Sequence, residues 1–229
     1  MIKPPILPVI AIDGPSGSGK GTISRYVAKS LGFHLLDSGA LYRSIVIAAD
    51  RKNISYSDHD QLSLIANDLK ISFKTNADKS EKILLNENDI THLVRDECTG
   101  LKASKIAEIP KVRQSLLNFQ RSFLKAPGLV ADGRDMGTHV FPSAKLKIFL
   151  TANIDERTKR RYKQLKDKGM NVNLAAVSKE IKSRDRRDSE RSVAPLVLAK
   201  DAKILDTSDL SIDDATKIIL KWFTDTKYT

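Results

Sequence analysis

Residues 14–22, which read GPSGSGKGT, combine the residue types and the spacing needed to bind phosphate. Glycines let consecutive backbone N–H groups turn toward one anion, and a helix that follows adds the N–H groups of its first turn. Lys20 is placed to reach the β- and γ-phosphates of a nucleotide. The sequence therefore predicts a nucleoside triphosphate site. Its residues are Gly14, Pro15, Ser16, Gly17, Ser18, Gly19, Lys20, Gly21 and Thr22.

The flanking residues supply the structural context that such a loop requires. A β-branched run at residues 9–12 precedes it, and apolar residues at helical spacing follow from Thr22. The spacing Gly14-x4-Gly19-Lys20 satisfies the Walker A pattern, but Gly21 stands where Ser or Thr is usual, and the hydroxyl arrives at Thr22. We expect a strand, a phosphate loop and a helix in that order.

Polar residues also follow other predicted strands of the core. Asp132 ends the apolar run at 129–132 as in a Walker B strand, whose acid holds Mg²⁺ or its water shell opposite the phosphate loop. Arg134 and Asp135 come directly after it. Ser38 and Arg43 follow the run at 33–36, at the edge where open α/β sheets bind ligands.

Arginines are concentrated between residues 157 and 191. Arg157, Arg160 and Arg161 share one helical face, and Arg184, Arg187, Asp188 and Arg191 recur at three- and four-residue steps in the next helix. Such a run by itself is usually a solvated face with salt bridges. Beside a nucleotide loop, we interpret it as mobile charge that covers the triphosphate.

These groups must be positioned by an α/β fold with a parallel central sheet and flanking helices. Core strands are predicted at 9–12, 33–36, 129–132, 147–151 and 204–206. Between them, residues 70–73 and 82–85 alternate as antiparallel strands and 86–89 forms a turn, which indicates an inserted subdomain. We expect a core at 1–56 and 106–229, a short lid at about 157–191 within it, and a small α+β insertion at 57–105.

Composition narrows the class of protein. The chain has 229 residues, one cysteine, and no apolar run near the roughly 18 residues of a membrane span. We therefore expect a cytoplasmic protein without a disulfide framework or a membrane partner. Its net charge of +11 fits phosphorylated small molecules better than nucleic acid, because few aromatic residues are interleaved with the basic ones. A monomer is expected.

Five stretches, in order and spread over most of the chain, closely resemble the bacterial cytidylate (CMP) kinase family of the nucleoside monophosphate kinase superfamily. They read IAIDGPSGSGKGT, LLDSGALYR, PKVRQSLL, ADGRDMGT and RDRRDSERSVAPL. The form GxxGxGKGT is typical of that superfamily, so Gly21 agrees with the resemblance. Other members read more like DGFPR where this chain has DGRD.

The resemblance implies ATP as phosphoryl donor, CMP or dCMP as acceptor, and Mg²⁺. It implies that Arg43, Arg134 and Arg191 hold the CMP phosphate, that Ser104, Arg113 and Asp135 read cytosine, and that Arg184 and Asp188 contact the ribose, with Ser38 nearby. Arg157, Arg160 and Arg161 would lie on the ATP side. Lys20, Arg134, Asp132 and Arg191 are the expected catalytic residues, and Thr22 and Asp132 the expected metal ligands.

Two other interpretations share the same loop. One is a P-loop kinase with another acceptor, such as UMP, AMP or shikimate. The other is a nucleotide switch or nucleic-acid binder without an acceptor, for which an insertion with convergent arginines is unnecessary.

Overall fold

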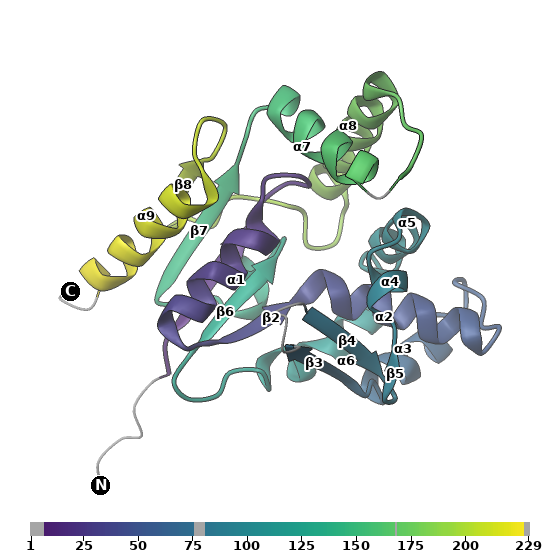
Figure 1. Cartoon of the computed structure of the whole chain (residues 1–229). Helices are drawn as coiled ribbons and strands as arrows, with labels where there is room; N and C mark the ends of the chain where they lie inside the picture. The colour runs from purple at the N-terminus through teal and green to yellow at the C-terminus, as the bar shows by residue number, and fades with distance from the viewer. Residues whose placement is uncertain (1–6, 76–80, 168, 227–229) are drawn as a thin grey trace, which may run out of the picture. The chain divides into compact units, whose positions relative to one another are not determined.

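The computed structural model describes residues 7–75, 81–167 and 169–226, and the chain divides into two compact units (Figure 1). The first unit contains the residues up to Leu36 and those from Phe123 onward, and the second is Asp37–Ser122. Each unit has its own sheet. No helix among the described ranges is both long and apolar enough to cross a membrane.

The first unit is built from β1 (Val9–Asp13), α1 (Lys20–Leu31), β2 (His34–Asp37, whose last residue opens the second unit), β6 (Leu129–Gly133), η1 (Met136–Val140), β7 (Leu146–Thr151), α7 (Ile154–Asp167), α8 (Leu174–Glu190), β8 (Lys203–Asp206) and α9 (Ile212–Asp225). The second is built from α2 (Ser38–Arg51), α3 (His59–Asn67), β3 (Ile71–Thr75), β4 (Glu81–Leu85), β5 (Asn88–Asp89), α4 (Thr91–Val94), α5 (Glu97–Ile106) and α6 (Pro110–Arg121).

The sheet of the first unit has the strand order β2-β6-β1-β7-β8. The pairings of β1 with β6, of β1 with β7 and of β7 with β8 are parallel. All residues of β1 and β6 are buried, as expected for parallel strands with both faces covered. The predicted α/β core is thereby confirmed, and each of its five predicted strands overlaps an observed one.

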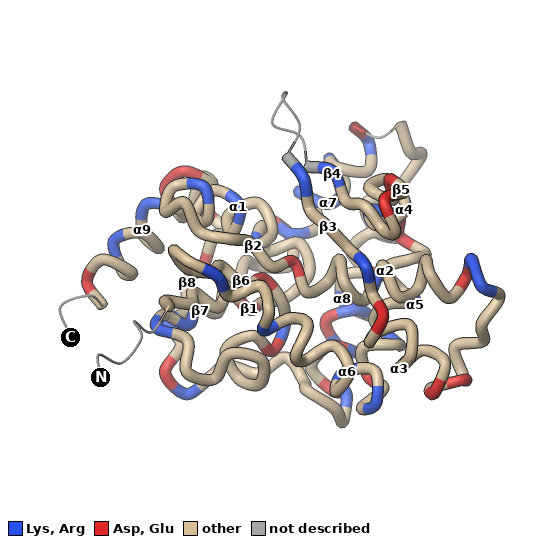
Figure 2. The backbone as a smooth tube through the Cα atoms, turned by 90° about the horizontal axis from the view of Figure 1, so that it is seen from below, with Lys and Arg blue, Asp and Glu red and all other residues tan. Residues whose placement is uncertain are grey.

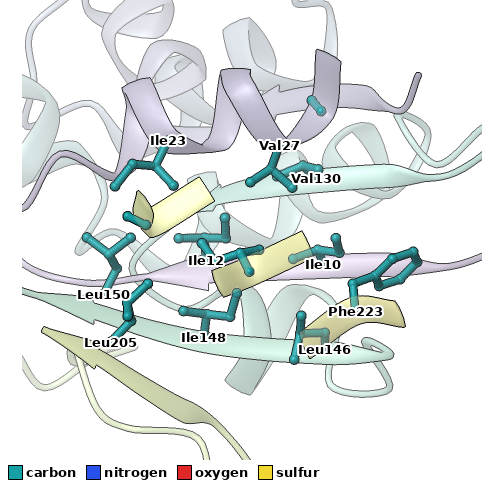
Figure 3. Packing of buried hydrophobic residues seen from close by; sticks show 13 residues of the cluster. Ile10, Ile12, Ile23, Val27, Val130, Leu146, Ile148, Leu150, Leu205 and Phe223 are labelled. Carbon is teal, nitrogen blue, oxygen red and sulfur yellow. The ribbon is translucent and has the colours of Figure 1, made fainter. Parts of the chain in front are cut away.

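The apolar core of this unit lies between the sheet and its helices. Ile10, Ile12 and Ile148 from the central strands are almost fully buried, and Ile23 and Val27 of α1 pack onto them (Figure 3). Phe223 of α9 joins this core and meets the ring of Phe33 edge-on at 5.6 Å between centroids. The core therefore fixes β1 and α1, between which the phosphate loop runs.

The second unit contains the three-stranded antiparallel sheet β3-β4-β5. Leu85 pairs with Asn88, so Asn86 and Glu87 form a two-residue hairpin turn, and both have positive φ angles (49° and 62°). A tight hairpin turn of this kind requires positive φ at both central residues. The predicted turn at 86–89 is therefore shorter in the structure, and its second half is β5.

The second unit also extends beyond the predicted insertion at 57–105. It begins at Asp37 and ends at Ser122, because α2 packs on α5 and α3 packs on α6. The buried faces of α2 and α6, including Leu41, Ile45 and Leu116, thus belong to the same core as the insertion. Sequence order showed where the antiparallel strands begin, but not which neighbouring helices pack with them.

Candidate active site

The backbone of the phosphate loop is shaped by glycines at close approaches and at left-handed positions. A Cβ on Gly14 would lie 2.0 Å from the carbonyl oxygen of Leu150 in β7, so only glycine lets the loop pass there. Gly17 and Gly19 have φ angles of 76° and 86°, which side chains rarely adopt. Because α1 begins at Lys20, the N–H groups of its first turn face the same loop. This geometry can bind a phosphate.

Lys20 is a buried cation inside the loop. Its Nζ donates to the carbonyl oxygen of Pro15 at 3.1 Å, and Ser18 Oγ donates to the same oxygen at 3.0 Å. Burial, followed by the nearby charge of Arg134, lowers the pKa of Lys20 to about 8, although Asp132 acts in the opposite direction. A bound polyphosphate would oppose both effects, so the site favours an anionic ligand.

Arg157 braces the loop from α7. Its Nε donates to the carbonyl oxygen of Ala152 at 2.9 Å, and its Nη1 contacts both the carbonyl oxygen of Ser16 at 3.1 Å and Asp185 Oδ2 at 2.5 Å. Asp185 belongs to α8, so one guanidinium links the loop and both helices. This support role was not expected from the sequence.

A second brace comes from Thr207, which directly follows β8. Its buried Oγ1 lies 3.1 Å from the carbonyl oxygen of Ser18 and 3.0 Å from that of Thr151. Arg160 donates to the Thr207 carbonyl oxygen at 2.5 Å and to Oγ1 at 3.1 Å. The sequence does not predict this role of Thr207, because a single hydroxyl after a strand forms no recognisable pattern.

Asp132 lies beside the loop, at the position expected of a Walker B acid. Its Oδ2 is 3.2 Å from the point that a Cβ on Gly21 would occupy. The carboxylate and the Thr22 hydroxyl offer oxygen ligands, which Mg²⁺ prefers, and Mg²⁺ commonly needs only one or two protein ligands besides phosphates and water. No cluster of three His, Cys, Asp or Glu residues that could hold a metal occurs among the described residues. The donor set fits Mg²⁺ carried by a nucleotide.

Arg134 and Asp188 form a largely buried ion pair. Arg134 Nε donates to Asp188 Oδ2 at 2.7 Å, and the side chains are 17% and 6% exposed. Burial by itself would raise the pKa of Asp188, but Arg134, then Arg184 and Arg191, holds it below its ordinary value. Lys20 also interacts with Arg134, Arg184 and Asp188. The structure thus brings together charged residues that lie more than 160 positions apart in the sequence.

The remaining predicted residues of the first unit lie on α7, after α8 and after β6. Arg161 of α7 is half-buried and donates through Nη1 to Gln164 Oε1 at 3.2 Å. Arg191, just after α8, donates through Nε to the carbonyl oxygen of Ala194 at 2.6 Å. Asp135 is buried immediately before η1.

Asp13 is a buried acid at the end of β1 that no sequence pattern indicated. Its two carboxylate oxygens accept from the N–H groups of Met136 and Gly137, both at 2.8 Å. Burial raises the pKa of Asp13 to about 6, although these two hydrogen bonds lower it. Its position directly before Gly14 is the one feature of the sequence that could have drawn attention to it. The phosphate-loop pattern begins at Gly14 and does not include this Asp.

In the second unit, two predicted residues are attached to α2. Ser38 Oγ donates to Gln120 Oε1 of α6 at 2.8 Å, and both residues are buried. Arg43 donates through Nη1 to the carbonyl oxygens of Val94 and Asp96 at 2.7 and 2.8 Å. The guanidinium is therefore held at the corner between α4 and α5.

The other two predicted residues of that unit lie on α5 and α6. Ser104 is half-buried on α5. Arg113 is 6% exposed, and its Nη1 lies 3.3 Å from both the Tyr42 hydroxyl and the carbonyl oxygen of Ala107. A guanidinium carries several N–H donors, so Arg113 is chemically suited to bind a polar or anionic group.

Basic residues are not confined to the two arginine-rich helices. Lys and Arg recur along α7 and α8, and Figure 2 also shows them along α9. In α8, Arg186 is exposed and pairs with Glu190 one turn on, at 2.9 Å. Arg157 and Arg184 of the same region are buried and half-buried, respectively. The region therefore combines a solvated face with arginines turned toward the loop, as Arg157 shows.

Comparison with known proteins places these features in one family. A family model described as cytidylate kinase matches residues 10–225. The cytidylate kinase of Methylococcus capsulatus is 52% identical over 215 residues, which cover 93% of this chain and 96% of the relative. The cytidylate kinase of Polynucleobacter asymbioticus is 49% identical over 217 residues, with 95% and 96% covered.

Among solved structures, an uncharacterized protein from Eubacterium ventriosum is similar in fold. It has a TM-score of 0.52 and 14% identity, and the match covers 95% of this chain and 98% of that one. At that identity the likeness concerns the fold alone.

Proposed function

The chain belongs to the cytidylate kinase family, and we propose that it transfers the γ-phosphoryl group of ATP directly to the phosphate of CMP or dCMP. It is a phosphotransferase that uses ATP to convert CMP to CDP. The observation that carries the proposal is the phosphate loop with buried Lys20, within a family match that spans residues 10–225.

The reaction is an in-line displacement. An oxygen of the CMP phosphate forms a bond to the γ-phosphorus while the bond to the β–γ bridging oxygen breaks, and ADP leaves with that electron pair. The acceptor oxygen is already anionic near pH 7, since a phosphate monoester has a second pKa of about 6. No general base is needed, so catalysis depends on positioning and on charge neutralisation.

The loop N–H groups and Lys20 neutralise the donor phosphates. Arg134 and Arg191 are proposed to stabilise the charge that develops on the transferred group. The ion pair with Asp188 supports Arg134 in this role, because it holds the guanidinium in one place before substrate arrives.

Mg²⁺ is a further part of the proposal. Thr22 and Asp132 would hold it or its water shell, and it would neutralise phosphate charge when bound. The position of Asp132 beside Gly21 supports this assignment.

Acceptor binding is proposed to use the residues that the family resemblance indicates. Arg43, Arg134 and Arg191 hold the CMP phosphate, and Ser38 assists. Ser104, Arg113 and Asp135 read cytosine, and Arg184 and Asp188 contact the ribose. A base that leaves Arg113 or Asp135 unsatisfied would lose about 1–3 kcal/mol for each buried hydrogen bond.

Arg157 and Arg161 are proposed to act on the ATP side. Arg157 supports the loop through the Ser16 carbonyl, so part of its effect on ATP is indirect. Arg160 supports the same loop through Thr207. Four further statements remain predictions from the sequence. They are lid closure over residues 157–191, a monomeric state, a cytoplasmic location, and the absence of a nucleic-acid or membrane partner.

The test is a coupled ADP-release assay with Mg-ATP against CMP, dCMP, UMP, AMP, GMP and shikimate. We expect fast turnover with CMP and dCMP alone. Fast turnover with UMP, AMP or shikimate instead would assign another acceptor to the same loop. If no acceptor raises ADP release above the control without acceptor, the proposed reaction is wrong, and titration with nucleic acid at several salt concentrations becomes the next measurement.

A further inference from the structure

Asp13 places a buried carboxylate between two functional segments, and no role proposed above uses it. It is the last residue of β1, directly before Gly14, and only 5% of its surface is exposed. Oδ1 accepts from the N–H group of Met136 and Oδ2 from that of Gly137, each at 2.8 Å. These two donors begin η1, directly after Arg134 and Asp135.

The first N–H groups of a helical segment have no partner within the segment. One carboxylate satisfies two of them through charge-assisted hydrogen bonds, which are stronger than neutral ones. Since β6 ends at Gly133, the pair Arg134 and Asp135 is held by the sheet on one side and by Asp13 on the other. The backbone of this pair is therefore fixed at both ends.

Burying the acid is unfavourable, as its raised pKa indicates. The charged groups that act on it are Asp135, which raises the pKa further, and Arg134, which lowers it. The stem of Lys147 from β7 lies beside Gly137, and its ammonium pairs with Asp201 at 2.9 Å. An apolar residue at this position would avoid the unfavourable burial but would leave both N–H groups without an acceptor.

We propose that Asp13 is a positioning residue for the acceptor nucleotide. Its carboxylate holds the backbone of Arg134 and Asp135, between β6 and η1, in the conformation that binds CMP. In the sequence, however, Asp13 directly precedes the ATP loop. The inference rests on the proposed function, in which Arg134 binds the CMP phosphate and Asp135 reads the base.

Asp13→Asn tests the proposal by replacing one acceptor oxygen with an NH₂ group that faces an N–H group. We expect the KM for CMP to rise about tenfold or more while the KM for ATP stays within about twofold, because one buried donor loses its partner. Asp206→Asn is the matched control. Asp206 also ends a strand of this sheet and accepts from a following backbone N–H group, that of Ser208 at 2.8 Å, but it is exposed. We expect this control to change neither KM.

Equal increases in both KM values for Asp13→Asn would overturn the proposal, because they would show that Asp13 acts through the phosphate loop. Unchanged KM values would also overturn it. A lower melting temperature with both KM values unchanged would indicate a merely structural role.

Hydrogen exchange in the wild-type chain keeps the proposal testable if Asp13→Asn does not fold. We expect the Met136 and Gly137 amides to exchange slowly in the free protein, and added CMP to slow them by less than about threefold. Fast exchange in the free protein that CMP strongly slows would show that the turn is not pre-formed and would overturn the proposal. The measurement without CMP does not depend on the identity of the acceptor, so it separates failure of this inference from failure of the proposed reaction.

Discussion

The two units present their candidate binding groups in different ways. In the first unit, contiguous residues form a glycine-rich loop that leads into α1, and Arg157 and Thr207 brace that loop through its carbonyl oxygens. In the second unit, Ser38 and Arg43 of α2 and Arg113 of α6 are single side chains, each held by a hydrogen bond to another element.

The two arrangements suit different kinds of ligand. A backbone cradle suits polyphosphate, because every nucleotide triphosphate presents the same oxygens. Side chains fixed one by one suit the recognition of a particular base, because a wrong partner leaves buried groups unsatisfied. Changes in the phosphate loop should therefore affect phosphoryl transfer with any acceptor, and changes at Arg113 should affect the choice of acceptor.

The largest expected effect is that of Lys20→Met, which has similar size but no charge. We expect turnover with CMP to fall by about 10³-fold or more, since the donor phosphates lose their buried cation. Steady-state kinetics measure this, and Lys29→Met on the exposed side of α1 is the control. Normal turnover in Lys20→Met would contradict the assignment of the loop.

The same variant is expected to unfold less readily than the wild type at pH 7. In the folded protein the pKa of Lys20 is about 8, below its ordinary 10.5, so the folded state binds fewer protons than the unfolded state between these values. Wild-type stability should therefore rise relative to the variant as pH increases from 8 toward 10.5. Urea unfolding at pH 7.5 and 9.5 checks this, and a constant difference would argue against the shifted pKa.

Phe223→Ala removes a buried ring from the apolar core of the first unit. A loss of about 3–5 kcal/mol in the free energy of unfolding is expected from similar truncations. Lys221→Ala, exposed on the same helix, should change stability by less than about 0.5 kcal/mol. Denaturant unfolding measures both, and similar losses in the two variants would show that Phe223 does not support the core.

Arg113→Ala should sharpen the contrast between the units. We expect the KM for CMP to rise about 10- to 100-fold, because CMP would lose one or two charge-assisted hydrogen bonds. The KM for ATP should be nearly unchanged. Arg121→Ala, exposed at the end of the same helix, is the control. Equal losses for CMP and ATP would contradict a role in reading the base.

The smallest expected effect concerns a matched pair of helix caps, one in each unit. Asp58 accepts from Gln61 N at the start of α3, and Ser211 accepts from Asp214 N at the start of α9. Replacing either by Ala should cost about 1 kcal/mol of stability without changing either KM. A selective increase in the KM for CMP from Asp58→Ala would show that α3 is coupled to acceptor binding.

Much of the fold follows from local pattern. The five core strands and the helix after the phosphate loop are predicted because burial on both faces produces continuous apolar runs and because apolar residues recur at helical spacing. The π-helical segment η1 at Met136–Val140 is missed, since its first N–H groups are satisfied by Asp13, 123 residues away from Met136 in the sequence.

The sequence alone predicts the phosphate loop, because its glycines, Lys20 and Thr22 all lie within residues 14–22. Position after a strand indicated Arg43, but Arg113 was named by the resemblance alone, because by itself it looks like an ordinary surface arginine. Only the tertiary structure decided which side chains support the site: Arg157 on the Ser16 carbonyl, Asp188 on Arg134, and Asp13 on the Met136 turn. These contacts join segments that are distant in the sequence, and burial strengthens them. Neither property can be predicted from the spacing of neighbouring residues.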